Sequence, residues 1–207
     1  GIEALSGDTT GSNSTAIGRK ALFAQNFDGD AFNVAIGNIA GQAVTTGIYN
    51  VIVGGQAGMA LTTGTRNVAI GLNALKSEDT GSHNVAIGHE ALKTADAGDD
   101  ISTGIQNTVV GGNAAKANIT TGSNNIVIGY DSDASAADVS NEITLGNSSI
   151  SALRCQVTSI SSLSDKRDKK DIKDSTYGLD FVDSLKPVTF EWDQRDGNRK
   201  GLKDVGF

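Results

Sequence analysis

A short apolar motif that ends in glycine recurs eight times, and this repeat limits the fold more than any other feature of the sequence. Its fullest form is Asn-Val-Ala-Ile-Gly, and successive terminal glycines are 17 to 23 residues apart, most often 17. A unit of this length holds one short strand and a turn, so a single copy cannot bury its own apolar side chains. The glycines that end the motif are Gly18, Gly37, Gly54, Gly71, Gly88, Gly111, Gly129 and Gly146.

Other positions keep the same frame. Six copies have an asparagine four residues before the glycine, and six have an alanine three residues after it. We interpret both kinds of repeated residue as structural: glycine permits turns and close backbone approach, and asparagine can form side-chain ladders or turns between coils. The asparagines are Asn33, Asn50, Asn67, Asn84, Asn107 and Asn125.

Stacking of these units at the strand spacing of about 4.8 Å predicts an all-β fold, a parallel β-solenoid or β-roll of about eight coils. Alternation along the strand places Val34 and Ile36 on one face and Ala35 on the other. So thin a coil leaves apolar surface exposed, which favours a homo-oligomer, and threefold symmetry is expected for a fibre. A one-turn helix at Ala74–Leu75 and Ala91–Leu92 stays open as a second element of each coil.

Composition excludes several classes of function. The chain has one cysteine, Cys155, and two histidines, so neither a disulfide nor a zinc site is expected, and we predict no metal and no cofactor. It has no apolar run long enough for a membrane span, and its net charge of −7 argues against nucleic acid and anionic membranes as partners. Asp96, Asp99 and Asp100 could bind calcium, but they lack EF-hand spacing, so a solvated loop is the preferred interpretation.

Charge density predicts a boundary near Ser161. Charged residues occupy 21 of the first 160 positions and 20 of the last 47. We therefore divide the chain into a β-solenoid domain (1–146), a serine-rich neck (147–163) and a C-terminal part (164–207). The apolar spacing of the neck fits a helical stripe, but its serine and β-branched content also fits extended chains around a trimer axis, which we favour.

The C-terminal part reads as the start of an α+β domain. Apolar residues three apart predict a short amphipathic helix over 179–185, which ends before Pro187. Alternating apolar residues then predict a strand over 188–192. Neither pattern continues the 17-residue repeat, so this part is a second structural unit.

The Asn-Val-Ala-Ile-Gly-x-x-Ala repeats, over residues 11 to about 149, resemble the head repeats of trimeric autotransporter adhesins and, more closely, the repeat shafts of bacteriophage tail fibres. The adhesin heads are left-handed parallel β-rolls that form trimers, although their repeat is shorter. The resemblance implies a homotrimer with a structural and adhesive role.

A second resemblance rests on Ser-Asp-x-Arg-x-Lys at 164–169, followed by Asp-Ile, Gly-Leu-x-Phe and Pro-Val. This segment is similar to the opening of the endosialidase-type intramolecular chaperone domain, peptidase family S74, which trimerises phage fibres and then cuts itself off. The resemblance implies that 164–207 is the truncated first part of that domain. It also implies a catalytic Ser-Lys dyad, Ser164 as nucleophile and Lys169 as base, that cleaves the Leu163–Ser164 bond once and turns over no external substrate. Such a serine needs a neutral amine beside it.

Together these features predict a trimeric tail fibre of a bacteriophage, located in the extracellular virion, that binds a glycan or protein receptor on the host surface and contacts other virion proteins. The alternative is the head of a cellular trimeric adhesin without proteolysis. A polysaccharide-degrading tailspike is disfavoured, because no catalytic carboxylate pair can be singled out. Receptor-binding residues are unknown; the candidate loops are Phe23–Phe32 and Thr94–Ile101. For Phe23–Phe32, covering the end of the solenoid is the preferred interpretation, since terminal coils need an apolar cover.

Overall fold

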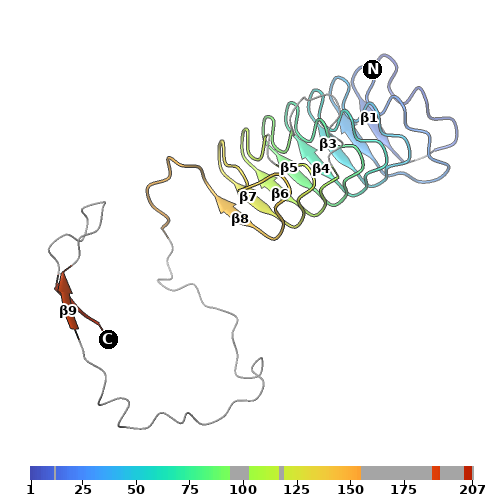
Figure 1. The fold of residues 1–207 in the computed structure, drawn as a ribbon. Coiled ribbons are helices and arrows are strands. Elements are labelled where there is room, and N and C mark those ends of the chain that lie inside the picture. Colours follow the sequence, from blue (N-terminus) through green and yellow to red (C-terminus); the bar gives the residue numbers. More distant parts are fainter. Residues whose placement is uncertain (12, 94–102, 117–118, 155–187, 192–202, 207) are drawn as a thin grey trace, which may run out of the picture. The chain divides into compact units, whose positions relative to one another are not determined.

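The computed structural model describes residues 1–11, 13–93, 103–116, 119–154, 188–191 and 203–206. The chain forms two compact units, Gly1–Leu153 and Arg154–Phe207. The first is a stack of coils (Figure 1) whose eight strands form one parallel sheet in the order β1 to β8. Among the described residues there is no helix, and hence none that could cross a membrane. The one-turn helix left open for Ala74–Leu75 and Ala91–Leu92 is therefore wrong; the chain turns there without one.

The motif frame is also the register of the sheet. Each strand has three residues, and equivalent motif residues pair from coil to coil: Ala35 pairs with Ile52, and Ile52 with Ala69. The predicted β-solenoid is confirmed, with about seven turns. Seven spacings of about 4.8 Å make the stack about 34 Å long. The strands are β1 (Thr15–Ile17), β2 (Val34–Ile36), β3 (Val51–Val53), β4 (Val68–Ile70), β5 (Val85–Ile87), β6 (Thr108–Val110), β7 (Ile126–Ile128) and β8 (Ile143–Leu145).

The interior of the coils contains mainly small residues. The central residue of each strand from β2 to β7 points inward and is fully buried, while the first and third residues point outward. The alanines three residues after the motif glycine are buried as well. The alanine side of the strand is thus the inner side, and the larger β-branched side chains lie outside. The inward-pointing residues are Ala35, Ile52, Ala69, Ala86, Val109 and Val127.

Large and small residues alternate between two facing interior positions. Where the strand centre is Ala69, the residue four after the motif glycine is the buried Leu75. Where the centre is Ile52, that residue is Gly58, and a Cβ there would lie 3.3 Å from Ile52 Cδ1. Gly41 in the preceding coil is closer still, since its Cβ would lie 2.9 Å from the same atom. Ile52 thus fills space that leucine fills in other coils.

The motif glycines allow the coils to approach closely. Gly71 has a φ of 138°, and a Cβ there would lie 2.3 Å from the carbonyl oxygen of Gly88 in the next coil. No L side chain fits this combination of dihedral angle and contact.

The motif asparagines form a buried ladder. Asn67 Nδ2 donates to the Gly81 carbonyl (2.8 Å), and Asn67 Oδ1 accepts from the Asn84 backbone N–H (2.9 Å). The same pattern links successive coils, which satisfies backbone groups that no strand pairing reaches. At the ends of the ladder, Ser14 Oγ accepts from the Asn33 N–H and the Glu142 N–H donates to Asn125 Oδ1.

In the second unit, β9 (Val188–Glu191) pairs antiparallel with β10 (Lys203–Gly206). The strand predicted over 188–192 therefore forms as far as Glu191. The helix predicted over 179–185 lies outside the described residues, as does the neck beyond residue 154. Residues 147–154 contain no helix.

Candidate functional site

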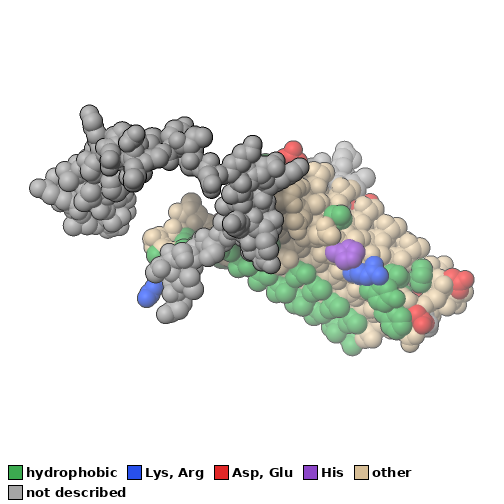
Figure 2. Space-filling view, turned by 90° about the horizontal axis from the view of Figure 1, so that it is seen from below, with side chains coloured by type: hydrophobic (Ala, Val, Ile, Leu, Met, Phe, Trp, Pro, Cys, Tyr) green, Lys and Arg blue, Asp and Glu red, His purple; other side chains and the backbone are tan. Residues whose placement is uncertain are grey.

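The outer face of the eight-stranded sheet is apolar and uncovered. It consists of two columns, formed by the first and the third residue of each strand, and its large hydrophobic side chains are 37% to 66% exposed. Figure 2 shows hydrophobic side chains gathered in a stripe along the stack. An exposed apolar surface of this extent is typical of a protein interface. These side chains are Ile17, Ile36, Val51, Ile70, Ile87, Ile126, Ile128, Ile143 and Leu145.

A column of stacked side chains borders this face on one side, five residues before each motif glycine. The Phe32 and Tyr49 rings are stacked, with centroids 5.7 Å apart and planes at 5°. The Arg66 guanidinium carbon lies 5.2 Å from the Tyr49 centroid. His83 continues the column as an exposed residue. We call Phe32, Tyr49, Arg66, His83 and Gln106 the aromatic column.

A second column borders the face on the other side, one residue after each motif glycine. Leu72 and Tyr130 are 50% and 69% exposed, and His89 is exposed between them. Gly55 and Gly112 occupy the same position in two other coils. We call these five residues the leucine-tyrosine column.

Carboxylates are missing from the whole band that joins these columns. From the residue five before the motif glycine to the residue one after it, the first seven coils contain no Asp or Glu, although 14 acidic residues precede Ile160. The bands are 13–19, 32–38, 49–55, 66–72, 83–89, 106–112 and 124–130. Depletion of acidic residues beside exposed aromatic and apolar residues is the composition of an interface core.

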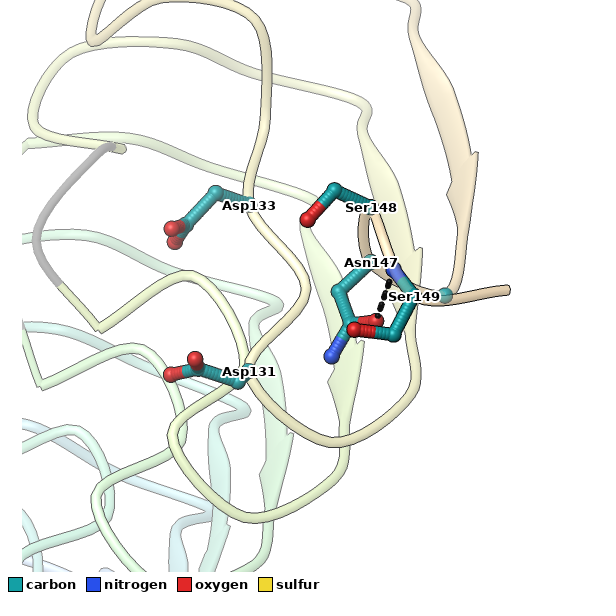
Figure 3. A pocket seen from close by; sticks show the side chains of 6 residues that line it. Asp131, Asp133, Asn147, Ser148 and Ser149 are labelled. Atoms are coloured by element: carbon teal, nitrogen blue, oxygen red, sulfur yellow. Dashed lines mark hydrogen bonds between the residues drawn. The ribbon is translucent and has the colours of Figure 1, made fainter. Parts of the chain in front are cut away.

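One polar cavity of about 460 Å³ lies near the last coil (Figure 3). Asp131 and Asp133 project from one loop, and the Asn147–Ser149 turn lies beside them, with the Ser149 N–H donating to Asn147 Oδ1 (2.9 Å). Partial burial, and secondly the charge of Asp131, raise the pKa of Asp133. The described part of the chain contains no group of three or more His, Cys, Asp or Glu residues that could hold a metal, so we assign no ion to this cavity.

Glu90 forms the most strongly coupled ion pairs among the described residues. Its carboxylate contacts Lys116 of the next coil and lies 3.3 Å from Lys93 Nζ. The hydrogen bond from Lys116 is the main cause that lowers the pKa of Glu90 from 4.5 to about 2. This cluster links two coils, and we interpret it as structural.

The candidate receptor loops have separate outcomes. In the first, Phe23 lies under the Lys20 ammonium (5.0 Å), and Phe32 belongs to the aromatic column. The N-terminal residues cover the first coil: Leu5 packs against the core and its N–H donates to the Ala21 carbonyl (3.0 Å). The second loop, Thr94–Ile101, lies outside the described residues.

The proposed dyad, Ser164 and Lys169, also lies outside the described residues and stays a prediction. Sequence reasoning missed the two bordering columns. The repeat could have revealed them, because bulky residues recur directly before the motif asparagine and directly after the motif glycine. They vary in type from copy to copy, so a search for repeated identities passes over them.

Residues 164–207 match a protein family described as Chaperone of endosialidase, Peptidase_S74. No curated protein and no solved structure matches the chain. The family match supports the prediction that an endosialidase-type chaperone sequence begins at Ser164. It lies C-terminal to a β-solenoid whose sheet face is apolar and uncovered.

Proposed function

We propose that the chain is part of a trimeric bacteriophage tail fibre that attaches the virion to the host cell surface. The observation that supports this most is the endosialidase-type chaperone match C-terminal to a solenoid with an exposed apolar sheet face. The protein is then extracellular, in the virion tail, where it contacts a glycan or protein receptor and other virion proteins. Three copies on one rod multiply weak receptor contacts.

The homotrimer would form with the three apolar sheet faces turned toward a common axis. Each half-exposed Ile or Val side chain that is buried there contributes about 1 kcal/mol. Two columns run the length of the stack, so the sum over three copies is enough to order the assembly. Carboxylates on this face would oppose such burial, and the first seven coils have none.

The C-terminal segment would act as a trimerisation chaperone and then release itself. Ser164 Oγ attacks the carbonyl carbon of Leu163, and Lys169 accepts the hydroxyl proton. The peptide bond breaks, the amine of residue 164 takes up a proton, and water hydrolyses the resulting ester. The products are a fibre chain that ends at Leu163 and a separate chaperone fragment that begins at Ser164.

Intact and native mass of the full-length protein test both parts. We expect a trimer of chains ending at Leu163 from the wild type, an uncut chain from Ser164→Ala, and normal cleavage in the matched control Ser162→Ala. Cleavage in Ser164→Ala would overturn the dyad. An uncut wild type would also overturn it and would leave a retained assembly domain.

The sheet face is tested separately. Ile70→Lys, in the middle of the apolar face, should yield monomers in native mass spectrometry, whereas Thr63→Lys, exposed away from this face, should remain trimeric. A wild-type monomer would refute the trimeric fibre itself.

A further inference from the structure

We propose that the trimer closes through a specific seam, in which the aromatic column of one copy packs against the leucine-tyrosine column of the next copy at the same height. This inference rests on the proposed trimer and deepens it, because it identifies which surfaces of this chain meet. The partner is a second copy of the chain in parallel orientation.

Symmetry requires two different surfaces. In a closed threefold ring each subunit uses one patch toward one neighbour and another patch toward the other. If the sheet faces point to the axis, the edge that precedes each strand meets the edge that follows the corresponding strand of the neighbour. The aromatic column lies on the first edge, two residues before each strand, and the leucine-tyrosine column on the second, two residues after it.

The aromatic column is already ordered in the single chain. Phe32, Tyr49 and Arg66 stack on one another across three coils, so little conformational freedom remains to be lost on association. Phe32 is 46% and Tyr49 44% exposed, so part of each ordered ring remains available to a partner. Tyr and Arg are also the residue types that dominate binding energy at protein interfaces.

The opposite column has a matching shape. A Cβ on Gly55 would lie 3.2 Å from Leu72 Cδ1, and one on Gly112 would lie 3.4 Å from Tyr130 Cδ2. Leu72 and Tyr130 therefore lie back over the glycine of the preceding coil, which raises their side chains to the height of that coil.

The seam then pairs chemically compatible groups at each height. Leu72 reaches the coil of Tyr49, so an aliphatic side chain meets an aromatic ring. Tyr130 reaches the coil of Gln106, so a phenol meets an amide that can both donate and accept a hydrogen bond. Neither column brings a buried carboxylate into the contact. Arg66 already stacks on Tyr49 and needs no acidic partner.

Disulfide trapping tests the seam in the full chain with Cys155→Ser as background. His83→Cys and His89→Cys replace exposed residues on the two columns of one coil. Five residues separate them within a chain, and the three-residue strand β5 among these is alone about 10 Å long. A disulfide requires Cα atoms about 4.4 to 6.8 Å apart, so any disulfide between the two must join different copies.

We expect the double variant, after mild oxidation, to run as a covalent trimer on a non-reducing denaturing gel, with over half of the chains linked. Each single variant should stay unlinked, as should the matched pair Thr80→Cys with His89→Cys, which moves one thiol off the seam. A second pair in the next coil, Gln106→Cys with Gly112→Cys, should give the same covalent trimer. It shows whether a failure of the first pair is due only to a local change at His83 or His89.

A native trimer in which neither seam pair cross-links would overturn this inference alone, and would leave the aromatic column as a free surface for another ligand. A dimer from His89→Cys alone would also overturn it, because that result requires a twofold contact of identical edges. A native monomer would refute the proposed trimer together with the seam.

Discussion

Ile52 and Gly58 offer a quantitative test of the interior packing, because their sizes are exchanged relative to Ala69 and Leu75 one coil later. Removing the three carbons beyond Cβ in Ile52→Ala costs about 2.4 kcal/mol at about 0.8 kcal/mol per carbon. The cavity left behind brings the total to about 4 kcal/mol. Gly58→Leu alone should cost about 2 kcal/mol, because its Cβ would start 3.3 Å from Ile52 Cδ1.

The double variant Ile52→Ala with Gly58→Leu recreates the arrangement of the next coil. Leu75 has a φ of 53° and Gly58 a φ of 52°, so leucine already occupies this backbone conformation elsewhere in the solenoid. Independent effects would sum to about 6 kcal/mol, whereas we expect a loss of about 3 kcal/mol or less, a coupling of about 3 kcal/mol.

Urea unfolding followed by circular dichroism, at one fixed protein concentration, measures each free energy of unfolding and completes the cycle. Tracking the midpoint and the slope together shows whether all variants still unfold in one transition. A double variant as unstable as the sum of the singles would refute the reasoning that the two positions share one interior space.

Three further predictions use the same unfolding assay. Asn67→Ala removes two buried hydrogen bonds and should cost about 2 to 4 kcal/mol, whereas the exposed control Asn38→Ala should change stability by less than about 0.5 kcal/mol; equal effects would contradict a ladder that stabilises the fold. The pKa of Glu90 is lowered from 4.5 to about 2 in the folded chain, so its ion pairs stabilise the fold above pH 4.5 and are lost as the pH falls toward 2. Glu90→Gln should therefore reduce the pH dependence of the unfolding free energy between pH 4.5 and 2. An unchanged pH profile would show that the Glu90 ion pairs do not cause this dependence. Gly71→Ala should cost more than about 2 kcal/mol, because of both its dihedral angle and its contact with the next coil, while Gly112→Ala, at an ordinary dihedral angle, should be nearly neutral; a tolerated Gly71→Ala would mean that the coils can separate.

The strand positions and their parallel register were predictable because the repeat fixes them together. Val34, Val51 and Val68 stand at the same place in the motif, and the only pairing that satisfies every coil at once puts them side by side. The longer spacings from Gly18 to Gly37 and from Gly88 to Gly111 leave this register intact. The helix alternative for Ala74–Leu75 failed because a coil this short has no room for a helical turn between its close-packed neighbours.

The sequence could not decide which face of the strand is inside. Val34, Ala35 and Ile36 alternate equally well in either sense, and burial of the larger residues is the usual outcome. The width of the coil reverses this outcome: the opposite wall approaches so closely that half of the strand centres are alanine. A larger centre needs compensation, as at Ile52 with Gly58. The bordering columns could not be predicted for a related reason: Phe32, Tyr49 and Arg66 come into contact only when the coils stack.

The outward-facing Val and Ile residues of the strands provide a physical reason for the proposed pairing of a solenoid with an assembly domain. A buried alanine gains little hydrophobic free energy, whereas a buried valine or isoleucine gains about 1.5 to 3 kcal/mol. In the single chain the second kind of residue stays half exposed along the sheet. In the proposed trimer, burial of these residues would add stabilisation that the single chain lacks. Before association, the same face would attract any other apolar surface. In the proposed trimer, a chaperone segment that brings three chains together would limit this exposure. Once the faces were buried the segment would no longer be needed, so its removal would leave the trimer intact.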